Sequence, residues 1–336
     1  MKNKNNNKLL VILGPTAAGK TKLAVKLAHK FNGEIVSADS RQVYRGMDVG
    51  TGKDLQDYVL PVRKSIKSKV HKVNTAKIPH HCIDVASPKT EFNLAKYVKL
   101  AHRAISDIQR KGKLPILVGG TGLYAQAVVE GYNLGGAHPH TIKGVGVKPD
   151  KKLRASLAKK SVAELRKILK KLDPQSKTKL DNKRYLIRYI EMVKQTKLPL
   201  KKLLTASDSN YDCLILGINL PRAEIVKLID KRLIERIEKQ GMIEEVEKLH
   251  KAGVSWKRLE SFGLEYKFVS QYLRGRADKD EMIVKLSIAI HQFAKRQMTW
   301  WRRWERQGRE IRWIDNYKIA KELIKHWLKK STGSNM

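Results

Sequence analysis

The sequence of 336 residues is poor in cysteine, proline, aromatic residues and acidic residues. Its two cysteines, Cys82 and Cys213, exclude a disulfide framework and fit a reducing cytosol. No segment approaches the roughly 18 consecutive apolar residues that a membrane-spanning helix needs. The apolar run Leu9–Leu13 is also too short for the core of a signal peptide. These absences predict a cytoplasmic protein without a membrane segment.

The scarcity of acidic residues leaves a large uncompensated charge. The chain has 70 Lys and Arg against 32 Asp and Glu, a formal net charge of +38 and a pI near 10.1. Self-repulsion of this size destabilises a compact domain, so it indicates a polyanionic partner. Composition alone leaves two partners open, a nucleic acid and an anionic membrane surface. The length predicts about two domains.

Short apolar segments alternate with helical patterns in the first part of the chain. Apolar residues recur at helical spacing after Lys20 and through Phe92–Arg110. Such alternation predicts an α/β fold with a parallel sheet flanked by helices. The segments that we predict to be buried strands are Leu9–Leu13, Glu34–Ala38, Pro115–Val118 and Cys213–Ile218.

The pattern changes at Gly131–Pro149, which has the composition of a loop. Two Lys-rich amphipathic helices are predicted after it, at Lys151–Leu172 and Lys183–Thr196, and from Arg222 the pattern is helical almost to the end. We therefore expect a helical domain inserted between the third and fourth strands. The predicted boundaries are a catalytic core at 1–130 and 205–330, a helical insertion at 131–204 and a disordered tail at 331–336.

A phosphate-binding loop follows the first strand. The segment fits the pattern G-x-x-x-x-G-K-[ST] and lies between a predicted strand and a predicted helix, as that loop requires. Its backbone N–H groups and the helix N-terminus favour an anion, Lys20 adds a full positive charge, and the Thr21 hydroxyl can bind Mg²⁺. The residues of this loop are Gly14, Pro15, Thr16, Ala17, Ala18, Gly19, Lys20 and Thr21.

The carboxylate that NTP hydrolysis or phosphoryl transfer uses to hold Mg²⁺ is absent from its usual place. The strand Pro115–Val118 ends in Gly119-Gly120-Thr121-Gly122, without an acid. Asp39, at the end of Glu34–Ala38, is the strand-terminal acid near the right place. It is followed by Ser40, Arg41 and Gln42 at the edge where such sheets bind ligands. A simple turn cap is the alternative role for Asp39.

Together these motifs resemble the tRNA dimethylallyltransferase (isopentenyltransferase) family. The match is ordered along most of residues 9–304, which makes it far more specific than the phosphate loop alone. The segments that carry it are 9–21, Ile35–Tyr44, Gly46–Lys53, Pro79–Asp84, Gly112–Tyr124, Gly241–Val246, Ala294–Trp300 and Arg302-Arg303.

The resemblance implies a P-loop NTPase-like fold and transfer of a dimethylallyl group from dimethylallyl diphosphate. The acceptor would be N6 of the adenosine at tRNA position 37, next to the anticodon. It implies that Asp39 is the general base and that Lys20 and Mg²⁺ stabilise the leaving diphosphate. It also places Thr16 and Thr121 near the reacting centre, and it adds Arg222 to the phosphate loop as a diphosphate ligand.

The resemblance also implies contacts with the tRNA anticodon stem-loop, made by a monomer. Two departures from the family pattern stand out: Lys183 and Tyr185 replace the family's Pro and second Arg, and Gly-Leu-Glu-Tyr at 263–266 replaces Gly-Tyr-Lys/Arg. The residues at matching tRNA-contacting positions are Asp39, Ser40, Arg41, Gln42, Thr121, Arg184, Tyr185, Leu186, Ile187, Arg188, Lys295, Arg296, Gln297 and Arg303.

Other interpretations remain at this stage. Trp300 and Trp304 lie one turn apart among arginines, and we expect them in the core rather than against RNA bases. Arg184 and Arg188 share a helical face that is either an RNA contact or a solvated surface. The alternative functions are an NTP-dependent kinase or RNA-stimulated NTPase, and an RNA-binding protein without activity.

Overall fold

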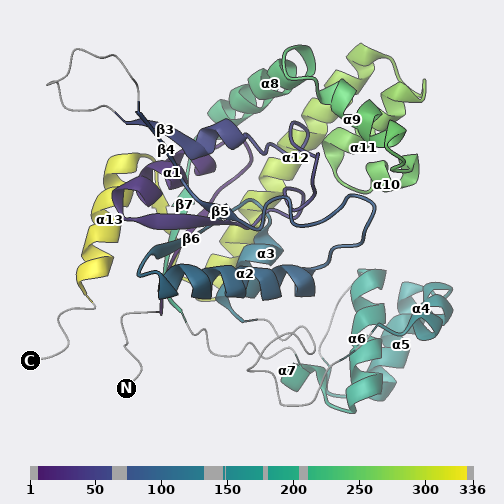
Figure 1. Cartoon of the computed structure of the whole chain (residues 1–336). Coiled ribbons are helices and arrows are strands. Elements are labelled where there is room, and N and C mark those ends of the chain that lie inside the picture. Colours follow the sequence, from purple (N-terminus) through teal and green to yellow (C-terminus); the bar gives the residue numbers. More distant parts are fainter. Residues whose placement is uncertain are drawn as a thin grey trace, which may run out of the picture. The chain divides into compact units, whose positions relative to one another are not determined.

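The computed structural model describes residues 7–62, 74–131, 147, 149–176, 181–203 and 211–330. The predicted tail at 331–336 and most of the predicted loop at 131–149 lie outside these residues. Internal contacts divide the chain into two units (Figure 1). The first consists of Met1–Phe92, Leu100–Ala125 and Tyr211–Met336, and the second of Asn93–Lys99 and Gln126–Asn210.

A parallel sheet forms the centre of the first unit. Within the described residues it has six strands in the order β5-β2-β6-β1-β7-β8, and every neighbouring pair is parallel. The predicted α/β fold with a parallel sheet is thereby confirmed, with two short edge strands added. The strands are β1 (Lys8–Leu13), β2 (Gly33–Ser37), β5 (His80–His81), β6 (Leu114–Val118), β7 (Asp212–Ile218) and β8 (Arg312–Ile314).

The strands are buried because helices cover the sheet. All five residues of β2 and of β6 are buried, as parallel strands between helices should be. A separate antiparallel pair consists of β3 (Val59–Val62) and β4 (Asn74–Lys77). The helical elements in the first 130 residues are α1 (Lys20–Lys30), η2 (Leu55–Tyr58), α2 (Leu94–Arg110) and α3 (Gly122–Val129).

The C-terminal half of the first unit is built around one long helix, α12. Its 28 residues begin after Asp278, whose carboxylate caps the helix by accepting a hydrogen bond from the Glu281 N–H. Helices α9 to α11 form a cluster with α12 (Figure 1). The helices here are α8 (Arg222–Glu238), α9 (Met242–Lys251), α10 (Trp256–Glu260), α11 (Leu264–Leu273), α12 (Lys279–Arg306) and α13 (Tyr317–Lys329). None of the helices in the described parts of the chain is long and apolar enough to cross a membrane.

The second unit has its own small apolar core, formed by α4 (Lys151–Ala158), α5 (Val162–Leu172), α6 (Lys183–Thr196) and α7 (Leu200–Leu203). The single helix predicted at Lys151–Leu172 is wrong. The chain leaves the helix after Ala158, and Ser161 begins a new one through reciprocal bonds with Glu164. This Ser-x-x-Glu capping box was readable in the sequence, and it outweighs continuous amphipathic spacing.

Candidate functional site

The phosphate loop lies between β1 and α1, as predicted. Ala17 and Gly19 have φ angles of 63° and 77°, left-handed values that turn the backbone toward the start of α1. The Lys20 Nζ atom donates a hydrogen bond of 2.7 Å to the Pro15 carbonyl. The loop is therefore already closed around the lysine, with the N-terminus of α1 facing the same space.

The ends of β2 and β6 meet beside this loop. The Thr121 N–H donates to the Ala38 carbonyl at 3.2 Å, and the Ser40 N–H donates to Thr121 Oγ1 at 3.1 Å. A Cβ on Gly119 would clash with the Ala38 backbone. Because the two strand ends approach so closely, there is no room for a side chain at Gly119, just after β6, and the acid near the strand ends is Asp39, which follows β2.

Asp39 makes the turn that the sequence offered as its alternative role, and it also lies in the site. One carboxylate oxygen, Oδ1, accepts a hydrogen bond of 2.9 Å from the Arg41 N–H, the local turn that a capping aspartate makes. Its side chain also lines two cavities that share the phosphate loop. The hydrogen bond that Oδ1 accepts in this turn therefore holds the Asp39 carboxylate in place inside the site.

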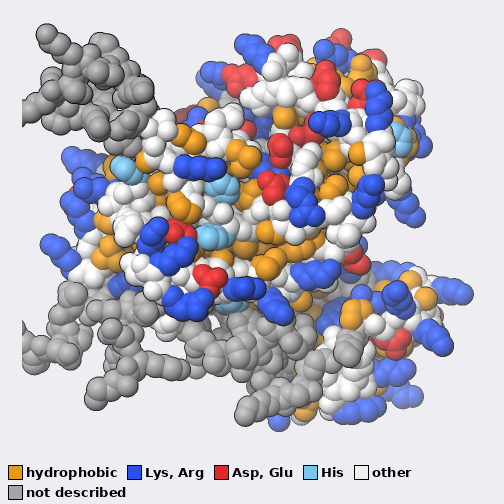
Figure 2. All heavy atoms as spheres, viewed as in Figure 1, with side chains coloured by type: hydrophobic (Ala, Val, Ile, Leu, Met, Phe, Trp, Pro, Cys, Tyr) orange, Lys and Arg blue, Asp and Glu red, His pale blue; other side chains and the backbone are white. Residues whose placement is uncertain are grey.

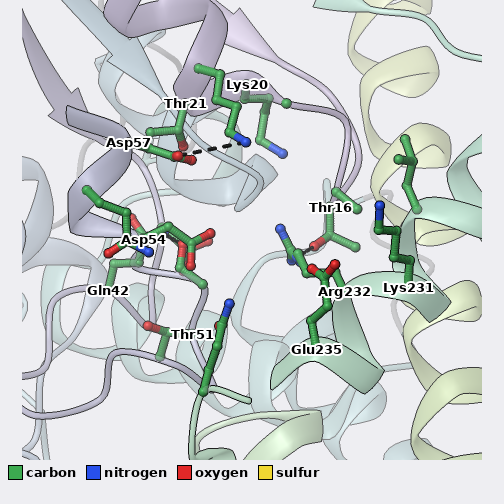
Figure 3. A pocket seen from close by; sticks show the side chains of 18 residues that line it. Thr16, Lys20, Thr21, Gln42, Thr51, Asp54, Asp57, Lys231, Arg232 and Glu235 are labelled. Carbon is green, nitrogen blue, oxygen red and sulfur yellow. Dashed lines mark hydrogen bonds and ion pairs between the residues drawn. The ribbon is translucent and has the colours of Figure 1, made fainter. Parts of the chain in front are cut away.

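The first cavity has a volume of about 500 Å³ and is lined by charged residues of both signs. Figure 3 shows Thr21, Asp54 and Asp57 on one side and Thr16, Lys231 and Arg232 on the other. Cations and oxygen ligands facing each other across one space suit a polyphosphate with a hard cation. The described residues contain no cluster of three or more His, Cys, Asp or Glu able to hold a metal unaided.

Arg232 is the arginine that α8 brings to the phosphate loop. Its Nη2 atom donates a hydrogen bond of 2.9 Å to Thr16 Oγ1, and it lines both cavities. Arg222, which the resemblance assigned to the diphosphate, is exposed at the first position of α8 and lines neither cavity. The two positions are ten residues apart, so they lie almost three helical turns from each other.

The second cavity, of about 450 Å³, opens from the same centre and has a more apolar wall. Gly122 leaves room for the Trp300 ring there, since a Cβ on Gly122 would clash with it. The cavity therefore offers aromatic and aliphatic surface beside the Asp39 carboxylate. Its lining includes Lys20, Asp39, Ser40, Arg41, Thr121, Leu123, Arg232, Leu264, Glu265, Ile290, Phe293, Arg296, Gln297 and Trp300.

Crowded positive charge characterises the centre of the site. Burial and the neighbouring Arg232 guanidinium lower the pKa of Lys20 to about 8, and Asp39 acts in the opposite direction. Burial and the charge of Arg236 likewise lower the pKa of Arg232 to about 10. Burial also lowers the pKa of Arg41. A bound polyanion would relieve this repulsion, so the site is electrostatically suited to a diphosphate.

Gln297 has a different place from the one expected. Its side chain is 6% exposed, and its amide bridges two backbone segments. Oε1 accepts from the Thr16 N–H at 2.8 Å, and Nε2 donates to the Gly120 carbonyl at 2.8 Å. Both ends of the amide are therefore used inside the protein, and Gln297 ties the phosphate loop to the end of β6.

The other predicted residues of α12 are exposed or line the second cavity. Lys295, Arg296 and Arg303 are exposed, and Arg296 is at the cavity wall. The buried tryptophans are Trp301 and Trp304, at 0% and 1% exposure, whereas Trp300 is half-buried. The core prediction thus holds for Trp304 but not for Trp300. Residues three apart also share a helical face, and here Trp301 and Trp304 are the pair that faces the core.

In the second unit the segment 184–188 divides between surface and core. Arg184 and Tyr185 are exposed, Ile187 is half-buried, and Leu186 is fully buried. Arg188 donates from Nη1 to the buried Glu191 carboxylate at 2.5 Å, which also accepts from Arg154. The side chain of Leu186 therefore has no surface to offer RNA, and Arg188 is already paired. Figure 2 shows basic side chains spread over both units rather than gathered in one patch.

The sequence reasoning missed several charged residues that line the two cavities, among them Arg232 and Glu265, and it missed Arg236 in the adjoining void. A signal for one of them existed, since Arg236 continues the buried stripe Ile225, Ile229, Leu233 on α8. A charged residue at an apolar position of an amphipathic helix indicates a buried partner or a ligand. Glu265 gave no such signal, because it faces the site only through the fold of α11.

Known proteins resemble this chain over most of its length. A model described as IPP transferase matches residues 42–304, and one described as isopentenyl transferase matches residues 7–66. The chain is 44% identical over 310 residues to tRNA dimethylallyltransferase 2 of Treponema denticola, covering 91% of this chain and 95% of the relative. It is 43% identical over 322 residues to tRNA dimethylallyltransferase 1 of Syntrophus aciditrophicus, covering 94% and 97%.

Solved structures share the fold. A tRNA isopentenylpyrophosphate transferase from Bacillus halodurans superposes with a TM-score of 0.65 at 31% identity, covering 97% of this chain and 98% of the other. A eukaryotic dimethylallyltransferase acting on tRNA gives a TM-score of 0.66 at 24% identity, covering 88% and 69%. The P-loop NTPase-like fold predicted from the resemblance is confirmed. The chain belongs to the IPP transferase family.

Proposed function

We propose that this protein transfers a dimethylallyl group from dimethylallyl diphosphate to N6 of the adenosine at tRNA position 37, next to the anticodon. One observation carries the proposal: the Asp39 carboxylate lies in the same space as Lys20 and Arg232, at the junction of two cavities. A base beside an anion site is what attack by a weak nucleophile on an allylic diphosphate requires.

The leaving group is held by the phosphate loop. As the allylic C–O bond breaks, its electron pair goes to the diphosphate, whose charge rises. The loop N–H groups, Lys20 and Arg232 face that position and stabilise the charge. The 2.9 Å hydrogen bond from Arg232 to Thr16 Oγ1 directs the guanidinium toward the loop before the donor binds. The positive charges that repel one another in the free protein then share a common anion.

The acceptor is activated by Asp39. The lone pair of adenine N6 is delocalised into the ring, so N6 attacks only if its proton is removed as the N–C bond forms. Asp39 Oδ2 has no hydrogen bond within the part of the chain that the structure describes, so it can receive that proton while Oδ1 keeps its hydrogen bond with the Arg41 N–H. The base enters after it leaves the anticodon-loop stack, and the aromatic wall of the second cavity, with Trp300 and Phe293, provides stacking surface.

The residues of the first cavity fit Mg²⁺. This ion prefers oxygen ligands and is usually held by one or two protein groups together with substrate phosphates and water. Thr21 would supply a hydroxyl, and Asp54 and Asp57 line the same cavity. When bound, Mg²⁺ would neutralise part of the charge on the leaving diphosphate.

The remaining basic surface suits the tRNA anticodon stem-loop. Arg184 in the second unit and Lys295, Arg296 and Arg303 on α12 are exposed cations able to contact phosphates. We assign to tRNA binding the second unit, which contains the helical insertion predicted at 131–204. We further propose that the protein acts as a monomer, in the cytoplasm, where tRNA resides.

Incubation of the protein with unmodified tRNA, Mg²⁺ and dimethylallyl diphosphate carrying a labelled allyl group tests the proposal. Label should appear in tRNA on an adenosine next to the anticodon, and equimolar diphosphate should be released. An otherwise identical tRNA with guanosine at that position is the matched control and should take no label. Turnover of ATP without label transfer would instead favour an RNA-stimulated NTPase or kinase.

A further inference from the structure

Arg236 is a buried guanidinium without adequate partners. It is 3% exposed, and its Nε and Nη2 atoms have no hydrogen-bond acceptor in the described structure. The nearest carboxylate, Asp54 Oδ2, is 3.6 Å from Nη2, too far for a hydrogen bond. A Cβ on Gly52 would be 2.6 Å from Nη2, so the group is also confined on that side. A buried charge in this position needs an anion nearby.

Glu265 is a second acid near the two arginines, in addition to Asp54. A void of about 10 Å³ is lined by Glu265, Arg232 and Arg236 together with three aliphatic side chains. That volume holds about one water molecule, which could accept from the guanidinium and donate to the carboxylate. Burial raises the pKa of Glu265, and the charges of Arg236 and Arg232 oppose that shift. The carboxylate therefore lies within the electrostatic reach of both arginines.

The position of Glu265 links this buried network to the substrate site. It is the second residue of α11 and also lines the second cavity, together with Asp39 and Lys20. Arg232 and Arg236, one turn apart on α8, repel each other, and that repulsion is one of the causes of the lowered pKa of Arg232. A carboxylate between them offsets the repulsion and keeps Arg232 near Thr16.

Glu265 also replaces a cation of the family pattern. The sequence has Gly-Leu-Glu-Tyr at 263–266 where the family pattern reads Gly-Tyr-Lys/Arg. The next residue, Tyr266, does not serve as an exposed RNA contact, since it is 1% exposed and donates from its hydroxyl to Glu245 at 2.6 Å. The negative charge of Glu265 is thus directed toward the anion site rather than toward the surface.

We propose that Glu265 is a positioning residue that balances Arg232 and Arg236, and that its charge weakens the hold of the site on diphosphate so that the product leaves. This inference rests on the proposed function, because diphosphate is the product that dimethylallyl transfer releases. Among the described residues, no hydrogen bond or ion pair joins the Glu265 side chain to the phosphate loop, although both line the second cavity, so Glu265 acts through Arg232.

The test is the affinity of the full-length protein for inorganic diphosphate, measured by calorimetry with and without Mg²⁺, in wild type and in Glu265→Gln. The neutral amide keeps the shape of the side chain, so the variant should bind diphosphate about tenfold more tightly. The multiple-turnover rate should fall more than the rate of a single turnover, since release becomes slower. Glu265→Asp keeps the charge and should restore most of the wild-type affinity.

Glu260→Gln is the matched control, because Glu260 lies on the neighbouring α10, pairs with Arg274 at 2.8 Å and lines neither cavity. It should leave diphosphate affinity unchanged. Unchanged or weaker diphosphate binding in Glu265→Gln, with a wild-type melting temperature, would overturn the inference. A wild-type protein that transfers no allyl group would overturn the proposed function instead, whatever Glu265→Gln does to binding.

Discussion

The Arg232 guanidinium donates a hydrogen bond of 2.9 Å to the hydroxyl oxygen of Thr16. This contact joins the middle of α8 to the phosphate loop across 216 residues of sequence. It places a second cation, Arg232, beside Lys20 and the backbone N–H groups of the loop. The proposed anion site therefore needs residues from both the N-terminal and the C-terminal part of the first unit.

Replacing Arg232 by Gln should therefore impair donor binding, whereas Arg222→Gln on the same helix should not. The first variant loses a half-buried charge that lines the cavity proposed for the diphosphate, and the second loses an exposed one. We expect KM for dimethylallyl diphosphate to rise about tenfold or more in Arg232→Gln, because charge-assisted hydrogen bonds contribute about 1.5–3 kcal/mol. Steady-state kinetics at saturating tRNA measure this. Equal effects in both variants would contradict the assignment.

Gln297 should behave as a structural clamp and not as a tRNA contact. In Gln297→Ala the Thr16 N–H and the Gly120 carbonyl lose their partners, and each buried unsatisfied group costs about 1–3 kcal/mol. The variant should unfold at a lower temperature and transfer slowly while binding tRNA nearly as wild type does. The exposed neighbour Arg296, changed to Gln, should show the reverse: normal melting and weaker tRNA binding. Thermal unfolding and a filter-binding assay separate the two.

The pH dependence of the reaction should report Lys20. Its pKa of about 8 in the free protein means that the ammonium is lost as pH rises through that value. Because kcat/KM reflects the free protein, kcat/KM for the donor should fall above about pH 8, and kcat should persist to higher pH since bound diphosphate favours the charged form. In Lys20→Arg, the kcat/KM that remains should not fall above about pH 8, because the arginine keeps its charge there.

The lowered pKa of Lys20 also makes the free energy of unfolding depend on pH. Between about pH 8 and the unfolded value of about 10.4, the unfolded chain binds its proton more strongly than the folded chain does. Folding should therefore become more favourable with rising pH in this window, as far as Lys20 is concerned. Denaturant unfolding of wild type and Lys20→Met at several pH values measures this effect as the difference between their free energies of unfolding. A difference that does not vary with pH would contradict the lowered pKa of Lys20.

Asp39→Asn should remove the chemical step and little else. The Asn side-chain oxygen can still accept from the Arg41 N–H, so the turn after β2 remains, but the amide cannot take the N6 proton. The single-turnover rate should fall by a factor of about 10²–10⁴, the usual contribution of a general base. tRNA affinity, measured in parallel, should stay within about twofold of wild type. A large loss of affinity with an intact single-turnover rate would refute the base assignment.

Arg184 and Arg188 should differ although they share a helix face. Arg184 is exposed, so Arg184→Gln should weaken tRNA binding and reduce the slope of log K against log salt by about one. Arg188 pairs with buried Glu191, so Arg188→Gln should instead lower the stability of the second unit. Salt titrations of tRNA binding and thermal unfolding of each variant distinguish the effects. Identical losses of binding would contradict the structural role of Arg188.

Much of this site was readable because it is local in sequence. The phosphate loop, Asp39 at the end of β2 and the turn to Ser40 and Arg41 each depend on neighbouring residues, and the structure brings them together as predicted. Gln297 illustrates the limit. A motif shows that a residue type belongs at a position, but the structure decides whether its amide faces RNA or bridges Thr16 and Gly120.

By itself the sequence determined the parallel α/β fold, the phosphate loop, the acid on β2 and the polyanionic partner, because strand periodicity, glycine spacing and net charge are properties of contiguous residues or of composition. Only the tertiary structure shows that Arg232 rather than Arg222 lies beside the phosphate loop, and that Glu265 lines a void together with Arg232 and the buried Arg236. These choices depend on which face of α8 and which end of α11 pack toward the loop, and long-range packing has no signature in local spacing.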